Sequence, residues 1–377
     1  MYHQSRRSGY RARQFDPSHL VRQATGAVPL AYVVKHQFED FALLDHIKHN
    51  IASRRYTVPT AIQDQAIPDI LLGRDVVGTA NTGTGKTGAF LIPVIHRVVT
   101  DPTRKVLVVV PTRELAIQIQ SELHLFARNL PVASVLCIGG EGMGKQIAGL
   151  KRQPAFVIGT PGRLRDLETQ KRLSFHGFNI IVLDEVDRMM DMGFLPEVKY
   201  ITACLPKVRQ SLFFSATVPA KVQEMMRGFL TNPILVAVKS HDVPVNVNQE
   251  VIRVGGQEKI AVLQNLLRRE GLDKVLVFGR TKWGMDKLAK ALSARGLAVA
   301  VIHGNKNQNQ RRRAIEQFKT NRVKVLIATD VASRGLDIDS VTHVINFDLP
   351  ESYEDYVHRI GRTGRVDKTG TAITLVA

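Results

Sequence analysis

Two short motifs, each directly after an apolar run, most constrain the fold of this chain. A small-residue loop at residues 80–87 follows the apolar residues 76–78, and the acidic pair Asp184 and Glu185 follows the apolar residues 180–183. A strand that ends in a loop of small residues lets backbone N–H groups wrap a phosphate, because no large side chain blocks the approach. Together the motifs predict a strand–loop–helix site that binds and hydrolyses a nucleoside triphosphate.

Each polar residue of these motifs has an expected role. We expect Lys86 to reach the terminal phosphates and Thr87 to offer its hydroxyl group to Mg²⁺. Asp184 would hold the metal, and Glu185 would orient or deprotonate a water molecule. The helix expected to start at Lys86 adds the positive end of its dipole. The other loop residues expected around the phosphates are Thr82, Gly83, Thr84 and Gly85.

The charge balance indicates a polyanionic partner. The 377 residues carry a formal net charge of +18, with a pI near 10.1. This charge exceeds what solubility requires, so a nucleic acid is the natural partner, and a generally basic solvated surface is the alternative. The length predicts two ordinary domains plus tails, and a hydrophobic content of 44% suffices for two cores.

The cysteines and the lack of long apolar segments favour a cytoplasmic protein. Cys137 and Cys204 lie too far apart in sequence for a local metal site, and their apolar neighbours predict buried thiols in a reducing compartment. No stretch approaches the ~20 apolar residues of a membrane helix. We therefore expect a cytoplasmic location, with association with the nucleoid as an alternative.

The first 34 residues have a composition of their own. They carry five arginines against a single acid, Asp16. This composition predicts a disordered basic arm that touches nucleic acid and could also contact protein partners. An organelle transit peptide is likewise rich in arginine and poor in acids, and it is the alternative.

Apolar runs alternate with helical segments on both sides of a polar stretch. The expected strands are 106–110, 132–138, 156–158, 180–183, 212–214 and 234–238, and then 275–278, 299–302, 323–327 and 344–347. Strands that alternate with helices predict α/β domains, each a mostly parallel sheet flanked by helices. We expect one domain at residues 35–238, a linker at 239–249 and a second domain at 250–377, which has no phosphate loop of its own.

The second domain carries an arginine cluster at residues 358–365. Glycines separate Arg359, Arg362 and Arg365, so the backbone can pass close to a neighbouring surface. An arginine supplied from another domain stabilises the charge that develops during phosphoryl transfer and raises the rate of hydrolysis by roughly 10³–10⁵. If Arg362 and Arg365 act in this way, hydrolysis requires the two domains to close. The alternative is a cluster that contacts a nucleic-acid backbone.

Two further polar segments follow apolar runs, where parallel sheets place ligands. The candidates are Thr329 and Asp330 for a nucleic-acid backbone, Gly335 and Asp337 for a ribose, and Ser215 and Thr217, together with Asp187 and His358, for sensing the phosphate state. Capping of the following helix is an alternative role for Asp330 and for the hydroxyl residues.

The ordered set of motifs resembles the DEAD-box RNA helicases of helicase superfamily 2, from Phe38 to the C-terminus. Phe38, Tyr56 and Gln63 match the nucleotide-binding Q motif of the family. The resemblance implies that the Gln63 amide reads the adenine edge and that the Tyr56 ring packs against the base, which predicts ATP over GTP. Ala80 replaces the first glycine of the common phosphate-loop pattern, as is typical of the helicase branch.

The resemblance also assigns a set of residues to RNA. They are Pro111, Thr112, Arg113, Gly140, Thr160, Pro161, Gly162, Arg163, Arg280, Thr281, Gln308 and Arg311. Hydroxyl groups, glycine amides and arginines satisfy phosphate oxygens without reading base edges, so RNA binding should be independent of sequence. Each short motif alone would equally fit a turn or a helix cap.

Two features depart from the family pattern. Val186 replaces the alanine of the tetrapeptide Asp-Glu-Ala-Asp, and overpacking there could cost about 1–3 kcal/mol unless its neighbours are smaller. The chain also ends at Ala377, just after an apolar run. We expect this last strand to lack a covering helix and to leave an apolar face exposed, and the alternative is a second domain that is truncated at its C-terminal end.

The resemblance implies two tandem RecA-like domains that form a monomeric ATP-dependent RNA helicase. ATP and Mg²⁺ are the expected cofactors, and single-stranded RNA or a short duplex is the expected partner. The residues expected to act in catalysis are Lys86, Asp184, Glu185, Arg362 and Arg365. Three alternatives remain: an RNA clamp or annealing protein, a DNA translocase, and a catalytically inactive RNA-binding scaffold.

Overall fold

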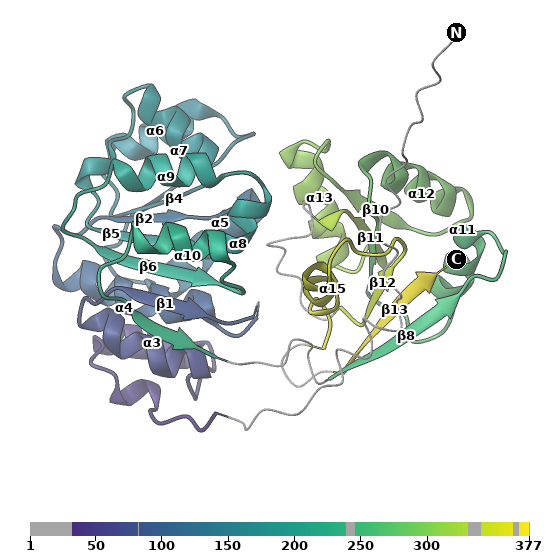
Figure 1. Cartoon of the computed structure of the whole chain (residues 1–377), viewed down its shortest axis with the longest axis horizontal. Coiled ribbons are helices and arrows are strands. Elements are labelled where there is room, and N and C mark those ends of the chain that lie inside the picture. Colours follow the sequence, from purple (N-terminus) through teal and green to yellow (C-terminus); the bar gives the residue numbers. More distant parts are fainter. Residues whose placement is uncertain (1–31, 82, 239–245, 331–340, 365–368, 377) are drawn as a thin grey trace, which may run out of the picture.

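The computed structural model describes residues 32–81, 83–238, 246–330, 341–364 and 369–376. Two sheets with helices on both faces form two α/β domains, which lie next to each other in Figure 1. The predicted fold class is confirmed. Of the predicted N-terminal arm only residues 32–34 are described, and there the Tyr32 hydroxyl group donates a hydrogen bond of 2.7 Å to Asp64.

The first sheet has seven parallel strands in the order β3-β4-β2-β5-β6-β1-β7. They are β1 Val76–Thr79, β2 Val106–Val109, β3 Ser134–Cys137, β4 Phe156–Gly159, β5 Ile180–Asp184, β6 Gln210–Ser215 and β7 Ile234–Ala237. The central strands are continuous apolar runs because helices bury both of their faces. Within β2, for example, Val106 and Val108 enter one core while Leu107 and Val109 enter the other.

Nine helices longer than one turn cover the two faces of this sheet within the described residues. One face packs against α2 Asp45–Ser53, α3 Ala61–Leu71, α4 Lys86–Thr100 and α5 Arg113–Phe126. The other packs against α6 Met143–Lys151, α7 Pro161–Thr169, α8 Val186–Asp191, α9 Leu195–Ala203 and α10 Ala220–Arg227. Two short 3₁₀ turns, η1 Phe38–Asp40 and η2 Phe175–Gly177, complete the first domain.

The second sheet has six parallel strands in the order β10-β11-β9-β12-β13-β8. They are β8 Val247–Arg253, β9 Val275–Phe278, β10 Val299–Ile302, β11 Val325–Ala328, β12 His343–Asn346 and β13 Gly370–Val376. The helices are α11 Lys259–Leu267, α12 Lys282–Ala294, α13 Gln308–Lys319 and α15 Tyr353–Ile360. Helices α11 and α12 share one core with the sheet, and α13 packs on the other face.

Two expectations about the second domain are wrong. Strand β8 begins at Val247, inside the segment predicted as a linker, because it pairs in parallel with β13. Strand β13 is an interior strand and not an uncovered one. Its Leu375 packs in the core with α11, and Ala372 packs against Tyr356 of α15, so both faces are covered.

The order of the strands decides which loops meet. Strands β5, β6 and β1 are neighbours in the first sheet, and β11, β9 and β12 are neighbours in the second. Because all of these strands are parallel, the loops after them gather at the carboxyl edge of each sheet, where α/β proteins bind ligands. Across the described residues, no helix has the length and apolar character needed to cross a membrane.

Candidate active site

The phosphate loop is folded around the ammonium group of Lys86. Gly83 and Gly85 adopt positive φ angles of 89° and 93°, which turn the chain sharply into α4. The Lys86 Nζ atom donates hydrogen bonds to the carbonyl oxygens of Ala80 at 2.5 Å and Asn81 at 2.9 Å. Burial lowers the pKa of Lys86, although nearby carboxylates oppose that shift. An arriving phosphate would exchange these carbonyl contacts for a stronger charged partner.

The other predicted loop residues are placed as follows. The Thr84 hydroxyl group donates to the Asn81 carbonyl oxygen at 2.8 Å, and Thr87 is half-buried in the first turn of α4. Thr82 lies outside the described residues.

The acidic pair stands at the end of β5, in the same sheet as the strand before the phosphate loop. The Glu185 N–H donates to Asp184 Oδ1 at 2.9 Å, and both side chains are buried. Burial, together with the neighbouring Glu185 carboxylate, raises the pKa of Asp184 to about 7. A divalent cation would reverse this shift because it favours the ionised carboxylate. Mg²⁺ commonly uses one or two carboxylates plus substrate phosphates, so this donor set fits it.

A buried arginine holds the second carboxylate of the pair. Arg188 Nη1 lies 3.0 Å and 2.9 Å from the two carboxylate oxygens of Glu185, and the Arg188 side chain is only 1% exposed. Sequence reasoning missed this contact. The i, i+3 spacing of an acid and a base at the start of a helix is the signal that could have revealed it.

Asp187 connects the acidic motif to the loop after β6. Its Oδ2 atom accepts hydrogen bonds from the Thr217 N–H at 2.9 Å and the Thr217 hydroxyl group at 3.1 Å. The Asp187 N–H donates to the Ser215 hydroxyl oxygen at 3.2 Å. Burial opposes ionisation, but the Arg188 charge and the Thr217 N–H outweigh it and hold the pKa of Asp187 below its usual value, with His358 acting in the same direction.

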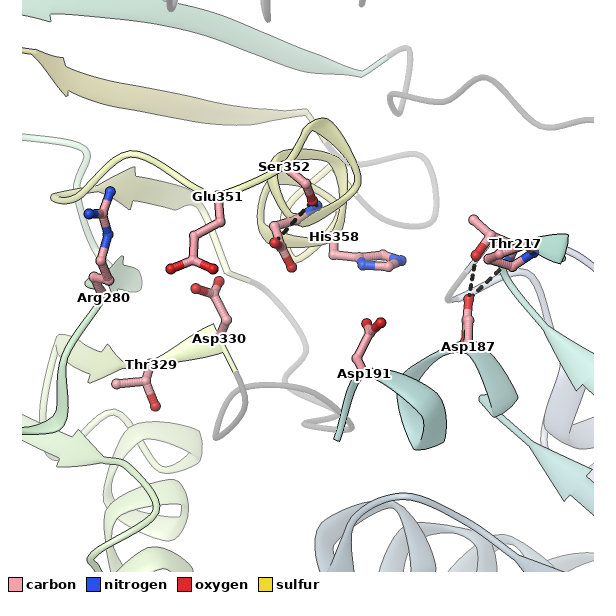
Figure 2. A pocket seen from close by; sticks show the side chains of 11 residues that line it. Asp187, Asp191, Thr217, Arg280, Thr329, Asp330, Glu351, Ser352 and His358 are labelled. Atoms are coloured by element: carbon pink, nitrogen blue, oxygen red, sulfur yellow. Dashed lines mark hydrogen bonds between the residues drawn. The ribbon is translucent and has the colours of Figure 1, made fainter. Parts of the chain in front are cut away.

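The two domains enclose a polar cavity of about 590 Å³. In Figure 2, Asp187, Asp191 and Thr217 of the first domain lie across the cavity from His358 and Thr329 of the second. The four residues predicted to sense the phosphate state therefore lie together, because Asp187, Thr217 and His358 line the cavity and Ser215 is bonded to Asp187. The lining of the cavity does not include Lys86.

The Q-motif glutamine lies against the phosphate loop. Gln63 Oε1 accepts from the Thr60 N–H at 2.9 Å, and its Nε2 donates to the Gly85 carbonyl oxygen at 3.1 Å. A Cβ atom on Gly85 would come within 2.7 Å of Nε2, which explains the glycine at this position. An amide has two N–H groups and two lone pairs, so one of each remains for an adenine edge.

The two aromatic residues of the Q motif differ in exposure. Phe38 is 1% exposed and packs in the core against Phe41, so in this conformation its ring stabilises the Q motif through core packing. Tyr56 is 39% exposed, and its ring lies 5.1 Å from the Arg54 guanidinium carbon. Tyr56 therefore keeps a free surface on which a base could pack.

Three of the threonines predicted to bind RNA are helix N-caps. Thr112 caps α5 and accepts from the Leu115 N–H at 3.2 Å, and Thr281 caps α12 and accepts from the Gly284 N–H at 3.0 Å. Thr160 precedes α7, which begins at Pro161. The Thr112 and Thr281 side chains thus act as helix caps, whereas the Thr160 side chain makes no capping hydrogen bond. The three helix N-termini, which attract anions, lie at the carboxyl edges of the sheets.

The remaining RNA candidates of the first domain surround these caps. The Arg113 guanidinium group lies against Gly139 and Gly140, where a Cβ atom would clash with it. Gly162 has open space around its Cα atom, and Arg163 Nη1 lies 3.4 Å from the Glu141 carbonyl oxygen. Pro111 is buried, in the run of buried residues 110–112 that follows β2.

Two RNA candidates of the second domain bridge to the first. Arg311 Nε lies 2.8 Å from Glu114 Oε1, and Gln308 Nε2 lies 3.4 Å from the same atom. Both residues belong to α13, and Glu114 belongs to α5. Glu114 was not predicted as a site residue, and this contact gives it a role in holding the domains together.

Asp330 is bound by an arginine of the cluster at residues 358–365. Arg359 donates to the two carboxylate oxygens of Asp330 at 2.6 Å and 2.8 Å, and also to Asn346 Oδ1 at 3.1 Å. Arg359 therefore fixes the loop after β11 to α15. Arg362 is buried just after α15, whereas Gly335, Asp337 and Arg365 lie outside the described residues.

Comparisons with known proteins agree with this arrangement. The DEAD/DEAH box helicase family model matches residues 60–225, and the helicase conserved C-terminal domain matches residues 258–367. The chain is 42% identical over 341 residues to the DEAD-box ATP-dependent RNA helicase CshA of Bacillus subtilis, covering 90% of this chain and 69% of that protein. The chain belongs to the DEAD-box RNA helicase family. CshA of Geobacillus kaustophilus is also 42% identical, with 90% and 73% covered.

Solved structures of DEAD-box proteins differ in how well they superpose. Yeast (S. cerevisiae) Dbp5 bound to RNA and ADP BeF3 gives a TM-score of 0.79 at 28% identity, covering 91% of this chain and 90% of that chain. A DEAD box protein from Methanococcus jannaschii gives only 0.54 at 35% identity, with 91% and 94% covered.

The departure at Val186 leads to a stability prediction. Val186 is buried in the same core as Leu183 and Met189. Val186→Ala removes two methyl groups, so we expect the free energy of unfolding in urea to fall by about 1–3 kcal/mol. Val208→Ala, at a position 90% exposed, should change it by less than about 0.5 kcal/mol. A gain in stability for Val186→Ala would instead show that the valine overpacks this core.

Proposed function

We propose that this protein is an ATP-dependent RNA helicase whose active site is completed by both domains. The observation that carries the proposal is the cavity between the domains, where Asp187 and Thr217 lie opposite His358. Asp187 follows the catalytic carboxylates, and His358 precedes Arg362 on the same segment. A movement of one domain therefore changes the surroundings of the phosphate site directly.

Each side chain of the site has a defined task. Lys86 leaves the loop carbonyl groups to pair with the terminal phosphates, and Gln63 and Tyr56 hold the base. Glu185 orients the attacking water, while Arg362 and Arg365 compensate the charge that develops on the phosphoryl group. Mg²⁺ held by Asp184 and Thr87 would neutralise charge on the phosphate oxygens. Gly335 and Asp337 are assigned to the ribose.

RNA binding is assigned to the carboxyl edges of both sheets. The helix N-termini that follow Thr112, Thr160 and Thr281 attract phosphates without reading bases. Dbp5 in its complex with RNA and ADP BeF3 has a domain arrangement similar to that of this chain, as the TM-score of 0.79 indicates. This similarity supports a path for RNA across both domains. A monomeric state, protein partners of the N-terminal arm and a cytoplasmic location stay predictions from the sequence.

The proposed function is tested by ATP hydrolysis without nucleic acid, with single-stranded RNA and with DNA of the same sequence. We expect strong stimulation by RNA and weak stimulation by DNA, because the 2′-hydroxyl group distinguishes the two. Equal stimulation would favour a DNA translocase. RNA-stimulated hydrolysis without separation of a short duplex would favour a clamp or an annealing protein.

The placement of Gln63 predicts the nucleotide preference. Gln63→Ala should raise the KM for ATP roughly 5- to 100-fold, since two hydrogen bonds worth about 1 kcal/mol each are lost. The KM for GTP should change less, so the preference for ATP should shrink. Gln65→Ala is the matched control, because Gln65 bonds within its own helix to Ala61. An unchanged ratio of ATP to GTP hydrolysis would contradict the assignment.

A further inference from the structure

The single tryptophan of the chain lies exposed on the second domain. Trp283 is the second residue of α12 and is 79% exposed. Helix α12 packs into its core through Met285, Leu288 and Leu292. At about 100° per residue, Trp283 lies on the side of the helix away from these three residues. The ring therefore contributes no core packing that would explain a large apolar side chain at this position.

Trp283 stands at the edge of the sheet that carries the RNA candidates. Thr281 caps α12, and Arg280 lines the cavity between the domains together with Thr329. Lys282 reaches the loop after β10, where its Cε atom is 3.2 Å from the place a Cβ atom on Gly304 would take. The loops after β9, β10 and β11 thus converge at Arg280 and Lys282, which lie next to Trp283 in the sequence.

The surroundings of Trp283 are strongly basic. Residues 279–313 contain nine lysines and arginines and one acid, Asp286. That acid is already paired, with Lys306 Nζ at 2.8 Å. Arg280, Lys282 and Lys287 are exposed, and Lys287 lies one helical turn from Trp283 on the same face. An exposed aromatic ring among cationic side chains can bind a polyanion that also carries planar groups able to stack on the ring.

We infer that Trp283 is a stacking platform for a nucleobase of the bound single-stranded RNA, beside phosphates held by Arg280 and Lys282. This inference rests on the proposed function and goes beyond it, because that function assigns the motif residues to the RNA backbone only. Bases stack on aromatic rings through their faces, so the contact tolerates any sequence. It requires an unpaired base, and it therefore favours a single strand over a duplex.

Intrinsic fluorescence tests the inference directly, because all tryptophan emission comes from this position. A single-stranded RNA oligonucleotide should quench the emission. The quenching should occur over the same concentration range as binding, which is measured by the fluorescence anisotropy of a labelled form of the same oligonucleotide. Polyphosphate has the charge but no bases, and it should leave the emission unchanged. Trp283→Ala should raise the Kd for RNA about 5- to 10-fold, near the lower end of base–aromatic stacking. Trp283→Phe should recover part of this loss.

Val208→Ala is the matched control. Val208 is 90% exposed but lies before β6, at the amino edge of the first sheet, and the RNA candidates lie at the carboxyl edges. The inference would be overturned, and the proposed function left intact, if RNA binds and stimulates hydrolysis without changing the emission of the wild type and if Trp283→Ala has the wild-type Kd for RNA. Equal quenching by polyphosphate would overturn it too. A tryptophan emission that changes with protein concentration in the absence of RNA would show that Trp283 contacts a second molecule of this protein, and it would overturn the inference. No RNA binding at all would instead defeat the proposed function.

Discussion

Glu185→Gln is expected to abolish RNA-stimulated ATP hydrolysis, with kcat lower by about 10²–10⁴. In the proposed mechanism the Glu185 carboxylate orients the attacking water or accepts its proton, and an amide of the same size cannot accept that proton. ATP binding should persist, because Lys86 and Gln63 remain. Steady-state hydrolysis at saturating RNA, with nucleotide binding measured in parallel, separates the two effects.

The control for Glu185→Gln must account for Arg188. The substitution leaves this buried guanidinium group beside a neutral partner, which lowers stability. Asp69→Asn is the matched variant. Asp69 pairs with Arg74 at 3.1 Å just before β1, at the edge of the sheet opposite to the phosphate loop. It should hydrolyse ATP like the wild type. Hydrolysis by folded Glu185→Gln at the wild-type rate would remove Glu185 from the mechanism.

Arg362→Ala should lower kcat by about 10³-fold or more, with a smaller effect on the KM for ATP. The reason is that charge on the transferring phosphoryl group grows toward the transition state, so an arginine that meets it acts mainly on the rate. Single-turnover hydrolysis at saturating ATP and RNA measures this effect. Arg322→Ala, at an exposed position after α13, is the control and should be close to the wild type.

The same variant decides between the two interpretations of the arginine cluster. If Arg362 contacts the RNA backbone only, the affinity for RNA should fall while kcat at saturating RNA stays unchanged. That result would contradict a role for Arg362 in catalysis.

The sequence predicted the parts of the site that depend on strand ends. Lys86 and the pair Asp184 and Glu185 each follow an apolar run, and parallel strands bring such residues to one edge of a sheet. Asp187 and Ser215 meet for the same reason, because β5 and β6 are neighbours.

The partners of the charged side chains could not be predicted in this way. Asp330 pairs with Arg359, about 30 residues away in the chain, and Arg311 pairs with Glu114, about 200 residues away. Only the packed fold determines such contacts. The burial of β13 depends likewise on its insertion between β12 and β8, and sequence order does not reveal strand order.

The central claim, that ATP and RNA together bring the two domains into the active arrangement, is tested most directly by energy transfer between one dye on each domain. Cysteines placed at the exposed positions Val208 and Glu270 provide the sites, after Cys137 and Cys204 are replaced by serine or alanine. We predict a change in transfer efficiency only when a non-hydrolysable ATP analogue and single-stranded RNA are both present. The same efficiency in all conditions, or a full change with either ligand alone, would contradict the account.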